Sequence, residues 1–202
     1  MAMVFNHGYP RKRYSKDDFI NFITFNSLKD HPELGDERYN FVTVRKHGEN
    51  DWKKVIKVQP GDKFTVRIFF HNNADPSLNE KGVSKDTKIS CTGGAFCSFE
   101  DEWESYGTDC EGFMAYISSE NADPKTVQDF CVVDLPEDLP AACFCRYIEG
   151  SSRITNSAGT HSFPMSAFRS EDGGDKIGVG QTMDGLIPAG ASGFIEQDYE
   201  VV

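Results

Sequence analysis

Residues 59–71, Gln-Pro-Gly-Asp-Lys-Phe-Thr-Val-Arg-Ile-Phe-Phe-His, combine a turn and a strand in one stretch. Pro60 and Gly61 occupy the two central positions of a type II turn, where proline presets φ and glycine takes the left-handed conformation. After this turn, every second residue from Phe64 to Phe70 is apolar. A period of two is typical of a strand with one buried face. The stretch therefore predicts a turn followed by a strand over residues 63–71 whose apolar face lies in the core.

Similar stretches of β-branched and aromatic residues occur on both sides of this strand, separated by Gly, Pro, Asn and Asp turns. Two pairs of them are expected to form hairpins: 39–46 with 52–58, and 126–135 with 141–148. About eight short strands at this spacing are typical of an all-β, two-sheet immunoglobulin-like sandwich, with a small closed barrel as the alternative. The other strands are expected at residues 19–25, 83–91, 113–119, 146–154 (with a bend at Gly150) and 190–202.

A length of 202 residues suits one all-β domain. Residues 1–18 are polar and are expected to form an N-terminal arm, so that the domain covers residues 19–202. The strand pattern lapses at about 91–112, where Gly93-Gly94 and three cysteines occur. We expect this cysteine-rich stretch to be a disulfide-held insertion into the sandwich.

Six cysteines lie within about a quarter of the chain, and their even number in a loop-rich acidic sequence favours disulfides. Six residues allow 15 pairings. Three cysteines precede Gly112 and three follow it, so full pairing requires at least one bridge between the two groups. In the predicted 126–135/141–148 hairpin, Cys131 lies opposite Cys145, which makes this the preferred pair. The candidates are Cys91, Cys97, Cys110, Cys131, Cys143 and Cys145.

Two alternatives remain for the cysteines. A structural zinc site normally uses pairs of Cys-x2–4-Cys, and neither the gaps before Cys110 nor the Cys143-Phe144-Cys145 sequence has that spacing. Free thiols would instead indicate a reducing compartment.

The formal net charge is −11, from 32 acidic and 21 basic residues. Such a chain repels phosphate backbones and anionic lipid head groups, so nucleic-acid binding and membrane insertion are not expected. The one basic cluster, Arg11-Lys12-Arg13, is too short for a binding stripe. No apolar stretch reaches the about 18 residues of a membrane span, and no signal-peptide core is present, so any signal or anchor is expected outside this sequence.

Catalytic motifs are not evident. The histidines are scattered without metal-ligand spacing and are expected at the surface, and the chain has no Gly-x-Ser-x-Gly elbow and no phosphate loop. We therefore predict no enzyme activity, no cofactor and no metal site. Oxygen ligands for calcium occur at Asp172-Gly173-Gly174-Asp175 and Asp184-Gly185, although each is too short for an EF-hand loop. The five histidines are His7, His31, His47, His71 and His161.

The best candidate for a contact surface is the acidic, aromatic part of the insertion, because aromatic side chains on a fixed loop make a rigid binding tip. In the alternative interpretation, Trp103 fills a small core inside the insertion. The candidate binding residues are Phe99, Glu102, Trp103 and Tyr106.

Several short phrases resemble the immunoglobulin-like β-sandwich domains of secreted and surface proteins of Gram-positive and candidate-phylum bacteria. The resemblance implies a fold and a secreted or cell-surface location, but no activity. The 91–110 segment departs from the pattern and puts a shared ligand site in doubt. The phrases include Ile23-Thr24-Phe25-Asn26-Ser27, Gly35-Asp36-Glu37-Arg38, Phe70-His71-Asn72-Asn73-Ala74, Glu120-Asn121-Ala122-Asp123-Pro124 and Asp184-Gly185-Leu186-Ile187-Pro188.

The sequence thus predicts a non-catalytic extracellular or cell-surface adhesion module that presents a disulfide-fixed loop to a protein or glycan partner. The alternative is a self-assembling subunit, a homo-oligomer built by strand exchange, in which the terminal strand 194–202 and the N-terminal arm pair with open sheet edges.

Overall fold

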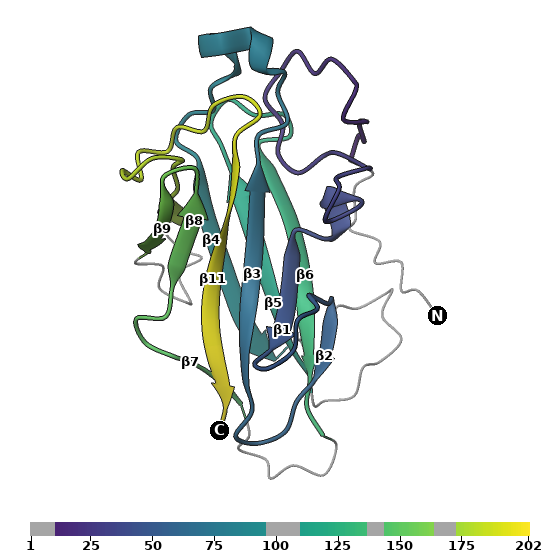
Figure 1. The fold of residues 1–202 in the computed structure, drawn as a ribbon, viewed down its shortest axis with the longest axis vertical. Coiled ribbons are helices and arrows are strands. Elements are labelled where there is room, and N and C mark those ends of the chain that lie inside the picture. The colour runs from purple at the N-terminus through teal and green to yellow at the C-terminus, as the bar shows by residue number, and fades with distance from the viewer. Residues whose placement is uncertain (1–10, 96–109, 137–143, 164–172) are drawn as a thin grey trace.

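A computed structural model of the chain describes residues 11–95, 110–136, 144–163 and 173–202. Within these residues the chain is almost entirely β, with two sheets stacked face to face and two short 3₁₀ turns (Figure 1). The elements are η1 (Glu37–Tyr39), β1 (Val42–Lys46), β2 (Val55–Lys57), β3 (Lys63–His71), η2 (Pro76–Gly82), β4 (Lys88–Ala95), β5 (Cys110–Ser118), β6 (Thr126–Asp134), β7 (Cys145–Tyr147), β8 (Arg153–Asn156), β9 (Gly159–Ser162), β10 (Asp175–Lys176) and β11 (Ser192–Val201).

The first sheet is built around β3, which has the bounds that the sequence predicts. Its strands run in the order β1-β3-β11-β8-β9. β7 pairs with the same edge of β11 as β8 does, but nearer the C-terminal end of β11. The predicted terminal strand is β11, which pairs with β3 over nine antiparallel positions from Ser192↔His71 to Glu200↔Lys63. The four side chains of the predicted apolar face of β3, at every second position from Phe64 to Phe70, are all buried. The predicted core face of this strand is therefore confirmed.

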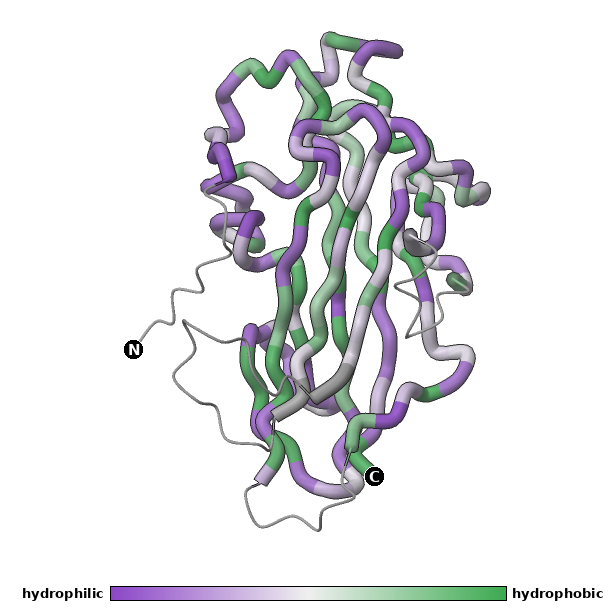
Figure 2. The backbone as a smooth tube through the Cα atoms, turned by 180° about the vertical axis from the view of Figure 1, so that it is seen from behind, coloured by the Kyte–Doolittle hydropathy of each residue, from purple (hydrophilic) through white to green (hydrophobic). Residues whose placement is uncertain are grey.

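The second sheet has the order β10-β4-β5-β6-β2. Hydrophobic and hydrophilic positions alternate along many of the strands, as half-buried sheets require (Figure 2). The two sheets meet at an aromatic contact: the Phe113 ring of β5 lies 4.7 Å from the Tyr199 ring of β11 and 5.7 Å from the Phe64 ring of β3, measured between centroids. All three side chains are buried. The all-β, two-sheet sandwich is thus confirmed.

Both predicted hairpins are wrong. β1 belongs to the first sheet, whereas β2 crosses to the second and pairs in parallel with β6, so only the single bridge Val44↔Lys53 links the two segments. β6 and β7 likewise lie in different sheets. The reason is that β6 already pairs with β5 on one side and β2 on the other. β2 occupies the C-terminal end of this second edge, from Val132 to Asp134, and β7 pairs with β11 instead.

The expected strand at residues 19–25 is also absent and is replaced by an irregular buried segment. Ile20, Ile23 and Phe25 are buried, but their spacing of three and then two does not fit a strand. Asn26 follows with a φ of 46°, which turns the chain away from an extended path. Its one β-bridge is Phe25↔Asn72, and the backbone N–H groups of Asn73, Asp75 and Asp123 donate to its carbonyl groups.

A buried ion pair joins the two sheets along one side of the sandwich. The Lys54 Nζ lies 2.8 Å from both carboxylate oxygens of Asp129 on β6, and the Asp129 side chain is fully buried. Asp129 also accepts the backbone N–H of Val42 at 2.8 Å, and Lys54 donates to the carbonyl of the same residue at 2.7 Å. Val42 opens β1, so this pair connects the first strand of one sheet to the second sheet.

The outward face of the first sheet carries a charged ladder. The Arg67 guanidinium lies 3.8 Å from the Trp52 ring centroid and 4.3 Å from that of Phe194. Arg67 donates to Glu196 at 2.8 Å, and Arg153 donates to both Glu196 and Asp198 at 3.0 Å. Stacking and pairing explain how charged side chains pack across neighbouring strands of one sheet face.

We expect this ladder to make stability fall in acid. Burial opposes ionisation of Asp198, but hydrogen bonds from Thr65 and Arg153 outweigh it and hold the pKa of Asp198 below its usual 3.8. A lowered folded-state pKa means that the ionised group stabilises the fold above about pH 4, and that this contribution is lost as pH falls through the folded pKa. Asp198→Asn should cost about 1 kcal/mol at pH 7 and less at pH 3, measured by urea unfolding. Asp134→Asn, at a more exposed pair with Lys57, is the control; equal losses at both pH values in Asp198→Asn would contradict the prediction.

Candidate functional site

The candidate contact residues lie outside the described residues. Phe99, Glu102, Trp103 and Tyr106 all fall in 96–109, so the structure leaves this surface as a prediction. What it does describe is the two strands that flank the segment. β4 ends at Ala95 rather than at residue 91, and β5 begins at Cys110 rather than at residue 113, because the Gly93-Gly94 stretch pairs regularly with Gly112 and Phe113.

Three of the six cysteines have described side chains, Cys91, Cys131 and Cys145; all three are buried and none is in a disulfide. The expected Cys131–Cys145 bridge is therefore not present. The two residues sit on β6 and β7 of opposite sheets, so they are not the cross-strand neighbours that a hairpin would have made them. Cys91 and Cys131 are separated by β5, so they do not pair either. The side chains of Cys97, Cys110 and Cys143 lie outside the described part of the chain.

The buried thiols should be unreactive in the folded protein. Burial raises the pKa of Cys91 to about 12 and that of Cys131 further, so neither provides the reactive thiolate near neutral pH. We expect iodoacetamide at pH 8 to leave Cys91, Cys131 and Cys145 unmodified in native protein, and to modify all three in urea without reductant. Peptide mass mapping measures this. A non-reduced digest that joins Cys131 to any other peptide would contradict the free thiols.

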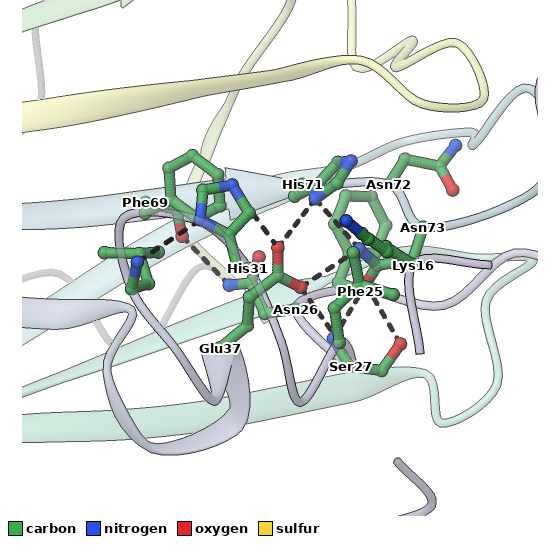
Figure 3. A network of polar contacts seen from close by, with 12 residues as sticks. Lys16, Phe25, Asn26, Ser27, His31, Glu37, Phe69, His71, Asn72 and Asn73 are labelled. Atoms are coloured by element: carbon green, nitrogen blue, oxygen red, sulfur yellow. Dashed lines mark hydrogen bonds and ion pairs between the residues drawn. The ribbon is translucent and has the colours of Figure 1, made fainter. Parts of the chain in front are cut away.

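A second cluster, which the sequence did not predict, lies at the end of β3. His31 follows the segment that crosses over β3, in a loop closed by paired hydrogen bonds between His31 and Gly35. Glu37 opens η1, whose N-cap Asp36 accepts the backbone N–H of Arg38. His71 is the C-terminal residue of β3. These three elements direct two imidazoles and one carboxylate toward a common point (Figure 3).

The geometry of this His31–Glu37–His71 cluster is close. His71 Nδ1 lies 2.7 Å from Glu37 Oε1, and His31 Nε2 lies 3.9 Å from the same oxygen. One ligating atom from each residue lies within 4.8 Å of those of the other two. Glu37 is fully buried, whereas the two histidine side chains remain 16–17 % exposed. Within the described residues, this is the one group of three potential metal ligands that meets so closely.

Surrounding polar groups fix the Glu37 carboxylate. Its Oε2 accepts the backbone N–H of Leu28 at 3.1 Å and the Asn73 amide at 3.0 Å. Asn73 is itself oriented, because its Oδ1 accepts both the N–H and the hydroxyl of Ser27. The Oε1 atom thus faces the two histidines while Oε2 is held by the fold. Such an arrangement suits either a proton shared with an imidazole or a cation held between the three side chains.

The expectation that these histidines lie at the surface is corrected for His31 and His71, which are only partly exposed. Sequence spacing could not reveal the cluster, because Glu37 and His71 are 34 positions apart and meet only when the 28–40 segment folds over β3. The one indirect signal was the acidic sequence Asp36-Glu37. Asp36 pairs with the buried Arg38 and stays partly exposed, but Glu37 points inward and is fully buried.

The other cation candidate is not formed by the described residues. Asp172 lies outside them, and the Asp184 carboxylate accepts the backbone N–H of Leu186 at 3.0 Å, as in an ordinary turn. No described helix is long and apolar enough to cross a membrane.

No protein-family model, no curated protein and no solved structure matches the chain. Its function therefore has to be argued from its own residues.

Proposed function

We propose that the chain is a non-catalytic binding module, an immunoglobulin-like sandwich of a secreted or cell-surface protein, that presents the segment between β4 and β5 to a protein or glycan partner. The observation that carries this proposal is the β4–β5 ladder. It is in antiparallel register from Lys88↔Ser118 to Ala95↔Glu111 and runs to one end of the sandwich, the lower end in Figure 1. A long regular hairpin is a rigid stem for the acidic and aromatic residues 99–106.

The surface beside this stem supports the same conclusion. An open hollow of about 560 Å³ is lined by residues of β1, β2 and the end of β6, among them Lys46, Lys57 and Asp134. Asp134 lies directly opposite Cys110, where β5 begins. Phe144, which is 52 % exposed, exchanges two backbone hydrogen bonds with Val202. Exposed apolar and charged groups at one end of a sandwich are the usual composition of a contact surface.

The proposal contains fewer disulfides than the sequence predicted. Because Cys91, Cys131 and Cys145 are not in disulfides, at most one bridge can form among Cys97, Cys110 and Cys143. A bridge between Cys97 and Cys110 would close the 96–109 segment at its base, which is the simplest way to hold a binding tip rigid.

Self-assembly by strand exchange is less well supported. β11, the strand proposed for exchange, lies inside its sheet between β3 and β8. Releasing it would expose Tyr199, Val201 and Ile195, which are buried. An exchanged strand is more readily supplied from an edge than from the middle of a sheet.

The test is binding of the labelled full chain to a printed glycan array and to a panel of purified extracellular glycoproteins. We expect a partner whose affinity falls more than tenfold in Trp103→Ala and is unchanged in Trp52→Ala, the matched tryptophan on the outward face of the first sheet. Binding lost in Trp52→Ala and retained in Trp103→Ala would place the contact elsewhere, and binding to no probe would count against the proposal. A mass that grows with concentration in light scattering would favour self-assembly.

A further inference from the structure

We propose that His31, Glu37 and His71 form a binding site for one divalent transition-metal ion of the Zn²⁺ type. The proposal is independent of the partner surface at the other end of β3. It rests on three ligand types from three separate elements, a loop, a 3₁₀ turn and a strand end, that converge on one point (Figure 3).

The distances require little rearrangement. Zinc binds nitrogen and oxygen at about 2.0–2.2 Å, so ligand atoms in a tetrahedral site lie about 3.4 Å apart. His31 Nε2 and Glu37 Oε1 are 3.9 Å apart and must approach by a fraction of an ångström. His71 Nδ1 and the same oxygen are 2.7 Å apart and must separate by a similar amount. Rotations of the imidazole rings, both partly exposed, can supply these shifts.

The charge of Glu37 also calls for a cation. Its side chain is fully buried, and no Lys or Arg of the described residues forms an ion pair with it. A buried carboxylate is stable when it is paired with a positive charge or bound to a metal. Here the positive charge is either a proton on His31 or His71, or a metal ion between them. The two states compete for the same lone pairs.

The carboxylate is oriented before a metal arrives. Leu28 and Asn73 hold Oε2, leaving Oε1 as a single-oxygen ligand that faces both histidines. Outer groups of this kind fix the direction of a metal ligand and raise affinity.

The ligand set selects the metal. Two imidazoles and one carboxylate suit Zn²⁺, Co²⁺ or Ni²⁺, whereas Ca²⁺ and Mg²⁺ prefer oxygen ligands alone. Three protein ligands leave a fourth position in a tetrahedral site, as in zinc sites that keep a water. The partial exposure of the two histidines places that position toward solvent.

Metal binding should change the hydrogen bonds that the His31 ring makes within its own loop. In the metal-free protein, His31 Nδ1 accepts the backbone N–H groups of Glu33 and Leu34, both at 3.3 Å. The neutral ring therefore carries its proton on Nε2. A metal on Nε2 moves this proton to Nδ1, and the two amide contacts must break.

The test is equilibrium dialysis of the reduced full chain with Zn²⁺ at pH 7.5, together with Co²⁺ absorption spectra. The variants are His71→Ala and Glu37→Gln. Glutamine can still accept from Leu28 and Asn73 and donate to His71, so Glu37→Gln should fold. His47→Ala is the control, since His47 contacts Thr65 and Asp198 away from the cluster. Ca²⁺ serves as the control ion.

We expect one Zn²⁺ whose affinity falls about 100-fold or more in both variants and is unchanged in His47→Ala. The Co²⁺ spectrum should lack the intense near-ultraviolet charge-transfer band of thiolate ligation, which separates this site from the cysteines. The amide resonances of Glu33 and Leu34 should shift on binding in wild type and not in His71→Ala. Equal zinc binding by wild type and both variants, or a thiolate band that accounts for all the bound metal, would overturn the proposal.

Discussion

Replacing Lys54 with methionine is expected to lower the free energy of unfolding by about 3–5 kcal/mol. Lys54 supplies the ammonium that faces both oxygens of the fully buried Asp129 carboxylate, and it also donates to the Val42 carbonyl. Methionine keeps the length of the side chain and removes only the charge and the donors. The Asp129 charge then stays in the interior without its ammonium partner, and the link between β1 and β6 is lost.

The measurement is urea unfolding followed by fluorescence, with Lys57→Met as the matched control. Lys57 is a neighbouring lysine whose side chain is 89 % exposed and whose Nζ lies 3.6 Å from Asp134. Exposed pairs contribute about 0–1 kcal/mol, so this variant should remain near wild type. The double variant Lys54→Met/Asp129→Asn should be less destabilised than the sum of the single variants, because Asp129→Asn removes the charge that has lost its ammonium. Equal effects of Lys54→Met and Lys57→Met would show that the ion pair is not buried in solution.

Phe113→Ala should be comparably damaging, with a loss of about 3–5 kcal/mol. The Phe113 ring lies between the two sheets, against Phe64 and Tyr199, and all three are buried. Truncation leaves a cavity at the point where β5 packs on β3 and β11. Strands on both sides pair with neighbours over many residues, so they cannot collapse far into that space.

The control for this variant is Phe144→Ala, because Phe144 is half exposed at the end of the sandwich. We expect the urea midpoint of unfolding of Phe144→Ala to stay close to wild type. The midpoint of Phe113→Ala should fall strongly, while the slope of the unfolding free energy against urea concentration stays unchanged. A small loss in Phe113→Ala would mean that the two sheets pack less closely at this point than the ring distances indicate.

Local patterns predicted single strands better than their partners. β3 has the predicted bounds, and β11 falls inside the predicted terminal stretch, because both follow a strict alternation with an apolar face. The hairpins failed because a turn between two strands does not reveal whether the chain returns to the same sheet. β2 crosses to β6, and no residue between 47 and 54 distinguishes this path from a hairpin.

The candidate sites show the same limit. The acidic, aromatic stretch at 99–106 was found from composition alone and stays a prediction, since it lies outside the described residues. The His31–Glu37–His71 cluster was missed because its members carry no common spacing. It exists only because the 28–40 segment packs across the end of β3. The Cys131–Cys145 pairing depended on a hairpin register, and it failed with the hairpin.

The central pairing of β3 with β11 has a consequence for how the chain acquires its fold. Arg67 and Glu196, which pair across these strands, are 129 residues apart. Contacts this distant in sequence slow folding, because the entropy of closing a long loop is lost before the favourable contacts form. During synthesis, β3 emerges from the ribosome long before β11. The edge of β3 that pairs with β11 therefore has no partner strand during this interval. The nascent chain therefore remains incompletely folded until β11 has been made, a state that calls for chaperone protection.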